Sequence, residues 1–190
     1  MARPLLLIVA GSNGAGKSTF AVPYAAARGL PFLNADELTR KYKELGESQA
    51  LVKAAREFLA TVDDYIARGE SVCIETTLSG GYVHGVAARA RAAGFRVELV
   101  YLFVESVEVA VSRVSTRVRK GGHHVPETDV RRRFARSLRN FDRLSGEVDG
   151  WRLFASANEG ITLAAEKRDG KVLTFSGDAL QTFRNLPRRS

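Results

Sequence analysis

The sequence has a single cysteine, Cys73, so it cannot form a disulfide within the chain. It also has no cluster of cysteines and histidines with the spacing of a zinc site, which excludes a zinc finger or a related structural metal centre. Because chains from oxidising compartments usually carry paired cysteines, we expect a reducing compartment, the cytoplasm. Cys73 itself is expected to be an inert, buried residue.

Long apolar runs are missing as well. The longest, 5–10 and 99–104, have six residues each, whereas a membrane-spanning helix needs about 20. The first run lies near the N-terminus, as in a signal peptide, but it leads into a glycine-rich loop without a cleavage site. We therefore expect a buried strand at 5–10 and no membrane association.

The composition is that of an ordinary globular protein. Of the 190 residues, 45% are hydrophobic and 26% are charged, which argues against a disordered or low-complexity chain. This length is typical of one large domain, 1–190, and the sequence contains neither an internal repeat nor an interdomain linker.

Short apolar runs alternate with amphipathic stretches, which predicts an α/β fold with parallel strands and helical crossovers. Strands are expected at 5–10, 31–33, 71–75, 96–104 and 151–155. Helices are expected near 17–28, 36–45, 48–68, 82–93, 106–120 and 127–144. Asp169-Gly170 lies between 161–168 and 171–176 and favours a two-residue β-hairpin, with a short helix after it at about 178–185.

Residues 11–18 read Gly-Ser-Asn-Gly-Ala-Gly-Lys-Ser and fit the pattern G-x-x-x-x-G-K-[ST] between an apolar strand and a helix. In such a phosphate loop, backbone N–H groups and the helix N-terminus bind phosphate oxygens, and the lysine reaches the terminal phosphates. The expected nucleotide-binding residues are Gly11, Ser12, Asn13, Gly14, Ala15, Gly16, Lys17, Ser18 and Thr19. Ser18 is the expected Mg²⁺ ligand, so ATP and Mg²⁺ are the expected cofactors. The predicted fold is a P-loop NTPase three-layer sandwich around a central parallel five-stranded sheet, with a C-terminal β-hairpin and short helix.

Other classes of P-loop protein have signatures that can be sought in this chain. No N-K-x-D string occurs, which argues against a switch GTPase. Residues 78–82, Leu-Ser-Gly-Gly-Tyr, look like the signature of ABC transporter ATPases. However, no strand ending in Asp-Glu follows, and the chain is short for that fold. We interpret 78–82 as a loop between a strand and a helix.

Transfer of a phosphoryl group to a hydroxyl needs a carboxylate near that hydroxyl and cations around the transferred group. Asp36 follows the second predicted strand, where the carboxyl ends of parallel strands form a binding crevice, and is the candidate general base. It could also cap the helix that follows. Glu75 ends an apolar strand, where an unpaired carboxylate is costly, and we favour a role in binding the acceptor over one in positioning the metal. Thr76 and Thr77 are candidate acceptor contacts, with a structural role as the alternative.

The net charge is +8, and the segment 113–143 holds ten basic against three acidic residues. Such a segment fits a phosphate site, a nucleic-acid surface or a solvated helix, and we favour the first. Residues 113–133 are interpreted as helix, Gly-Gly turn and helix, resembling a lid that closes and excludes water. Arg113 and Arg117 are four residues apart on one helix face and are expected to point at phosphates. Arg132 and His123 are further candidates for substrate binding.

Several of these segments together carry a family resemblance. Residues 11–19, 34–36 (Asn-Ala-Asp), 75–78 (Glu-Thr-Thr-Leu) and 113–133 resemble the zeta-toxin family of P-loop kinases over about residues 5–160. The resemblance implies a nucleoside-kinase-like sheet and ATP-dependent phosphorylation of a sugar hydroxyl, which in well-studied zeta toxins belongs to UDP-N-acetylglucosamine. It also implies Asp36 as the base, Glu75 and the nearby threonines at the acceptor, and Arg113 with a lid arginine such as Arg117 at the phosphates.

We therefore expect a kinase that phosphorylates a hydroxyl of a small metabolite, with a UDP-activated amino sugar as the leading acceptor. One alternative keeps the fold but takes a nucleoside, a sugar or a nucleic-acid 5′-hydroxyl as acceptor. Another is an ATP-binding regulatory module with little transfer activity. The resemblance also raises a separately encoded antitoxin as a partner, whereas a nucleic-acid partner is not favoured.

Overall fold

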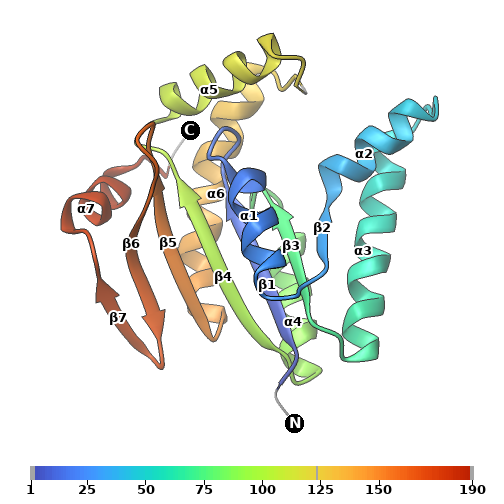
Figure 1. The fold of residues 1–190 in the computed structure, drawn as a ribbon, viewed down its shortest axis with the longest axis horizontal. Helices are drawn as coiled ribbons and strands as arrows, with labels where there is room; N and C mark the ends of the chain where they lie inside the picture. Colours follow the sequence, from blue (N-terminus) through green and yellow to red (C-terminus); the bar gives the residue numbers. More distant parts are fainter. Residues whose placement is uncertain (1–2, 123, 189–190) are drawn as a thin grey trace.

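The computed structural model describes residues 3–122 and 124–188 and is built around a seven-stranded sheet in the order β2-β3-β1-β4-β5-β6-β7 (Figure 1). The strands are β1 (Leu5–Gly11), β2 (Phe32–Asn34), β3 (Val72–Thr76), β4 (Arg96–Phe103), β5 (Gly150–Ser156), β6 (Ile161–Arg168) and β7 (Lys171–Thr174). The helices are α1 (Lys17–Ala26), α2 (Ala35–Glu44), α3 (Ala50–Arg68), α4 (Tyr82–Ala92), α5 (Val107–Arg119), α6 (Glu127–Glu147) and α7 (Gly177–Asn185).

The parallel part of the sheet confirms the prediction from the sequence. β2 pairs with β3, β3 with β1, β1 with β4 and β4 with β5, all in parallel. The predicted hairpin is β6 and β7, and it does not stand apart: β6 pairs antiparallel with β5 and extends the same sheet. Its turn residues, Asp169 (φ 51°) and Gly170 (φ 76°), both have positive φ, as a type I′ hairpin requires.

Helices cover both faces of the parallel strands. In Figure 1, α1 lies in front of β1, whereas α4 and α6 lie behind the sheet. This three-layer arrangement explains the continuous apolar runs, because a strand covered on both faces has no polar side. All residues of β1 from Leu6 onward are buried, as are all residues of β3.

Helices form near all of the ranges expected from the sequence. The buried residues of α3 are Ala50, Ala54, Phe58 and Val62, and Gly69 ends the helix in the left-handed conformation with φ 67°. The Ser106 side chain accepts a hydrogen bond from the Val109 N–H and caps α5. α2 and α3 pack against each other beside β2 and face α5 across the edge where the parallel strands end (Figure 1).

Two expectations about reactivity and membranes were drawn from the sequence. Cys73 is buried within β3, and desolvation raises the pKa of its thiol to about 12, so the unreactive thiol form dominates at neutral pH. Within 3–122 and 124–188, no helix is both long and apolar enough to cross a bilayer.

Candidate active site

The loop between β1 and α1 forms a cradle of backbone. Gly11, Gly14 and Gly16 have φ values of 149°, 80° and 79°, which L side chains rarely adopt. α1 begins at Lys17 without a side-chain cap and without an acidic residue in its first turn. Its N-terminal N–H groups and its positive dipole end therefore remain available to an anion. Among the described residues, the buried Ser12 Oγ and Asn13 Oδ1 in this loop also lack a hydrogen-bond partner.

Close packing makes glycine necessary at position 14. A Cβ there would lie 2.6 Å from the Ala110 carbonyl oxygen, in addition to the positive φ. We expect Gly14→Ala to destabilise the protein by at least about 2 kcal/mol, because left-handed strain of about 1–2 kcal/mol adds to the clash. Thermal unfolding should show a drop in Tm of about 4–8 °C.

Gly46→Ala is the matched control for this change. Gly46 has a similar φ of 74°, but nothing lies within 4 Å of its would-be Cβ. It should therefore report left-handed strain alone and cost less than Gly14→Ala. Equal losses in the two variants would show that the contact with Ala110 is unimportant.

Lys17 lies inside this cradle. It is only 8% exposed, and its Nζ donates a hydrogen bond to the Ser12 carbonyl oxygen at 3.0 Å. Burial lowers the pKa of Lys17, while the negative charges of Glu75 and Asp36 act in the opposite direction. The ammonium group therefore lies close to both carboxylates that the sequence singles out.

Glu75 lies at the end of β3, paired in register with Val9 of β1. Its carboxylate accepts hydrogen bonds from Ser18 Oγ (3.0 Å) and from Asn34 Nδ2 (3.2 Å). The pKa of Glu75 is raised above its usual value because desolvation is the largest effect. The charge of Lys17 and the hydrogen bond from the Ser18 hydroxyl act in the opposite direction. A hydroxyl and a carboxylate in contact, both oxygen donors beside a phosphate cradle, fit the ligand chemistry of Mg²⁺. The geometry thus favours metal positioning for Glu75 over the acceptor contact expected from the sequence.

Asp36 lies in the first turn of α2. The helix is capped by Asn34, whose Oδ1 accepts a hydrogen bond from the Asp36 N–H at 2.8 Å. The alternative role of Asp36 as N-cap is therefore filled by Asn34. The Asp36 carboxylate instead lines a cavity of about 410 Å³ that also includes Ser18.

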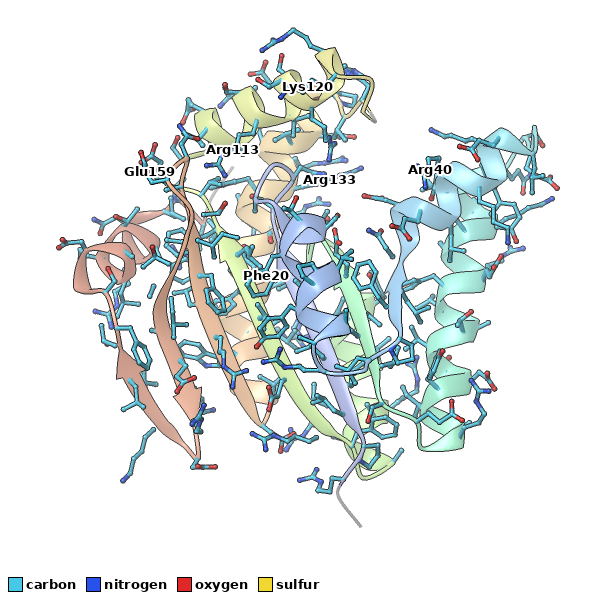
Figure 2. The ribbon with its side chains drawn as sticks, in the orientation of Figure 1. Phe20, Arg40, Arg113, Lys120, Arg133 and Glu159 are labelled. Atoms are coloured by element: carbon cyan, nitrogen blue, oxygen red, sulfur yellow. The ribbon has the colours of Figure 1, made fainter. Side chains whose placement is uncertain are left out.

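This cavity joins the P-loop to α2 and to the end of α5. Its lining residues are Ser18, Asn34, Asp36, Glu37, Thr39, Arg40, Lys43, Arg117, Gly121 and Gly122. Arg40 and Lys43 were not identified from the sequence, although Asp36, Arg40 and Lys43 follow each other at intervals of four and three residues. That spacing places the three side chains on one helix face. It is the sequence pattern from which Arg40 and Lys43 could have been predicted as site residues. Figure 2 shows Arg40 on α2 across from the P-loop.

Arg113 and Arg117, both expected to point at phosphates, line different cavities. Arg113 lines a second cavity of about 260 Å³ between α5 and the segment 155–159. Its Nη1 donates to Ser156 Oγ (2.9 Å) and its Nη2 to Asn158 Oδ1 (3.3 Å). Four residues along a helix correspond to a shift of about 6 Å, enough for each arginine to reach a different cavity.

The remaining candidates are placed as follows. Arg132 is exposed and forms an ion pair with Asp129 of its own helix at 2.7 Å, outside both cavities. Arg133, its neighbour and labelled in Figure 2, also pairs with Asp129, at 3.6 Å, and lines neither cavity. His123 lies outside the described residues.

The two threonines after Glu75 take part in hydrogen bonds of their own loop. Thr76 Oγ1 accepts hydrogen bonds from the Leu78 N–H and from the Tyr82 hydroxyl, each at 3.0 Å. Thr77 Oγ1 lies 2.9 Å from Ser79 Oγ. Neither threonine is among the residues that line the two cavities.

Comparison with known proteins places this geometry in a family. The model of the AAA domain family matches residues 6–144, which is most of the chain. An uncharacterized protein of Haemophilus influenzae is 28% identical over 124 residues, which cover 65% of this chain and 88% of that protein.

Solved structures share the fold at low sequence identity. The AvrRxo1-ORF1:AvrRxo1-ORF2 complex with ATP has a TM-score of 0.76 and 20% identity and matches 100% of this chain, which spans 65% of that one. The PezAT chromosomal toxin–antitoxin system of Streptococcus pneumoniae has a TM-score of 0.61 and 15% identity, covering 96% of this chain and 79% of the other. A gluconokinase of Sinorhizobium meliloti has a TM-score of 0.52 and 20% identity, covering 97% and 94%. The chain belongs to the AAA domain family and has the α/β fold of P-loop kinases.

Proposed function

We propose that this protein is an ATP- and Mg²⁺-dependent kinase that phosphorylates a hydroxyl group of a small metabolite, with a UDP-activated amino sugar as its acceptor. The observation that carries the proposal is the 410 Å³ cavity, because it joins Ser18 of the P-loop to Asp36 and to the cationic side chain of Arg117. A phosphoryl donor site, a carboxylate base and cations around the transferred group are the parts that such a reaction needs.

The cradle and the Arg113 cavity are assigned to ATP. The P-loop N–H groups and Lys17 would hold the phosphates, and the cavity between Arg113 and residues 155–159 lies where the nucleoside can extend from them. Ser18 and Glu75 would hold Mg²⁺, directly or through water. The ion would supply positive charge that stabilises the phosphate oxygens.

Asp36 is assigned the role of general base. It lines the acceptor cavity beside Ser18, where it can accept the proton of an attacking hydroxyl. Glu75 is engaged by Ser18 and Asn34 and is therefore assigned to the metal. The two carboxylates are thus assigned separate roles, because Glu75 is held by two hydrogen bonds and Asp36 lines the acceptor cavity.

The charge of the acceptor cavity supports an anionic acceptor. Arg40, Lys43 and Arg117 provide three cations, against the carboxylates of Asp36 and Glu37. A diphosphate such as that of a UDP-sugar carries negative charge that these cations can bind, whereas a neutral nucleoside or a free sugar carries none. This is what favours the UDP-amino sugar over the neutral acceptors.

Two proteins with similar folds were solved with a partner or within a toxin–antitoxin system, as their names state. A separately encoded antitoxin is therefore part of the proposal for this chain. Co-expression of the gene beside its genomic neighbours, followed by affinity purification, tests that part by itself.

The test of the function is acceptor-dependent ADP release with purified protein, ATP and Mg²⁺, followed by mass spectrometry of the product. UDP-amino sugars, nucleosides, free sugars and 5′-hydroxyl oligonucleotides are compared. We expect a UDP-amino sugar to gain one phosphate. Transfer to an oligonucleotide that weakens steeply with added salt would support a nucleic-acid kinase instead. ATP binding without any acceptor-dependent turnover would support the regulatory module.

The double variant Arg40→Ala/Lys43→Ala tests the charge of the acceptor cavity. We expect KM for the UDP-sugar to rise by about tenfold or more while KM for ATP is unchanged, because one charge-assisted hydrogen bond is worth about 1.5–3 kcal/mol. Lys41→Ala is the matched control, since Lys41 is exposed on the same helix and does not line the cavity. An unchanged acceptor KM in the double variant would remove the argument for an anionic acceptor.

A further inference from the structure

The loop between β3 and α4 contains a strained residue. Leu78 has φ 53°, a left-handed conformation that is unfavourable for a side chain with a Cβ. It is also completely buried, so its side chain is held in the core. Such a conformation persists only where the surroundings hold it, and it is found preferentially at functional sites.

A side chain from α6 holds this loop. Asn140 Nδ2 donates a hydrogen bond to the Leu78 carbonyl oxygen at 2.8 Å and lies 3.5 Å from the Gly80 carbonyl oxygen. Asn140 is 62 residues away in sequence from Leu78, so the contact is specific to the tertiary fold. The same amide group thus engages two carbonyls of one short loop.

Side chains of α4 and α3 also hold the loop between β3 and α4. The Tyr82 hydroxyl donates to Thr76 Oγ1 at 3.0 Å, and the Tyr82 ring packs edge-on against Phe58 of α3, with ring centroids 6.1 Å apart. The Leu78 N–H donates to the same Thr76 oxygen. Thr76 follows Glu75 directly, so the loop and the carboxylate that binds Ser18 form one continuous piece of structure.

We propose that Asn140 is a positioning residue for phosphoryl transfer: it holds the strained loop 77–81 through the Leu78 carbonyl and thereby places Glu75 beside Ser18. This role rests on the proposed function. Asn140 acts indirectly. It holds the loop, and the residues that the loop keeps in place reach the reacting groups.

The test compares Asn140→Ala and Asn140→Asp with wild type in the full-length chain. The first removes the donor, and the second sets a carboxylate against the two carbonyls. We expect kcat for the acceptor to fall about tenfold in the first variant and further in the second, with ATP affinity within twofold of wild type. Hydrogen exchange of the amides at 77–81 should accelerate in both variants.

Ser145→Ala is the control on the same helix, because the Ser145 hydroxyl donates a hydrogen bond to the Asp142 carbonyl oxygen within α6. It should leave kcat and the exchange at 77–81 as in wild type. Equal kcat in wild type and in both Asn140 variants, with accelerated loop exchange, would overturn the positioning role and leave the proposed function intact. A loss of ATP affinity in step with kcat would also overturn it, because that pattern indicates general destabilisation. A wild-type protein that transfers phosphate to no acceptor would overturn the proposed function and this role with it.

Discussion

Asp36→Asn is expected to lower kcat for phosphoryl transfer by about 10²–10⁴, the range attributed to a positioned general base. The amide has nearly the shape of the carboxylate but cannot take the proton of the attacking hydroxyl. Because α2 is capped by Asn34, replacing Asp36 does not remove the cap, and the helix should remain formed. ATP affinity should stay close to that of wild type. Steady-state kinetics with the identified acceptor, together with ATP titration, measures both quantities.

Asp178→Asn is the matched control for this variant. Asp178 also lies in the first turn of a helix, α7, whose cap is the separate residue Ser176. Both substitutions remove one negative charge near a helix N-terminus, which costs about 0.3–1 kcal/mol of stability. Asp178→Asn should therefore reproduce the small change in Tm without the kinetic defect. If Asp36→Asn keeps kcat within about threefold of wild type, Asp36 is not the base.

Lys17→Met is expected to lower kcat/KM for ATP by about 10²–10³, the usual cost of removing one preorganised group that stabilises developing charge. Lys17 is buried in the cradle, with its ammonium group close to Glu75 and Asp36. Methionine keeps the length and apolar volume of the side chain, but it leaves the buried Glu75 without the positive charge that lowers its pKa, so some loss of stability is expected. Tm is therefore measured beside the kinetics, and a variant that stays folded at the assay temperature assigns the kinetic loss to the site.

Lys17→Arg separates charge from geometry. The planar guanidinium is wider than an ammonium group, and the cradle around Lys17 is closed by the Ser12 carbonyl that accepts its hydrogen bond. We expect no recovery of activity in this variant. Lys53→Met, at an exposed lysine paired with Glu47 on the surface, controls for loss of one positive charge and should behave as wild type. Full activity of Lys17→Met would exclude the assigned role of the P-loop lysine.

Local patterns determined a large part of this protein. The phosphate loop consists of consecutive residues, so its motif can be recognised in the sequence. Its glycines have the positive φ values that the motif requires. β1, β3 and most of β4 are buried, largely apolar runs because helices cover both of their faces, and that burial leaves a signal in each of these strands separately. The Asp169-Gly170 turn is equally local, since two adjacent residues supply both positive φ values.

The tertiary structure determined which residues come together at the candidate site and what each of them contacts. Arg113 and Arg117 lie four residues apart on one helix, yet Arg113 contacts Ser156 at the end of β5 and Asn158 after it, whereas Arg117 lines the acceptor cavity. Glu75 was identified from the sequence, but its partners Ser18 and Asn34 are 57 and 41 residues away and become neighbours only through strand order. Asn140 carries no local signal, because its contact depends on where α6 crosses the loop after β3. Periodicity and motifs record interactions within one segment, whereas cavities and long-range hydrogen bonds arise from packing between segments, which no short stretch of sequence encodes.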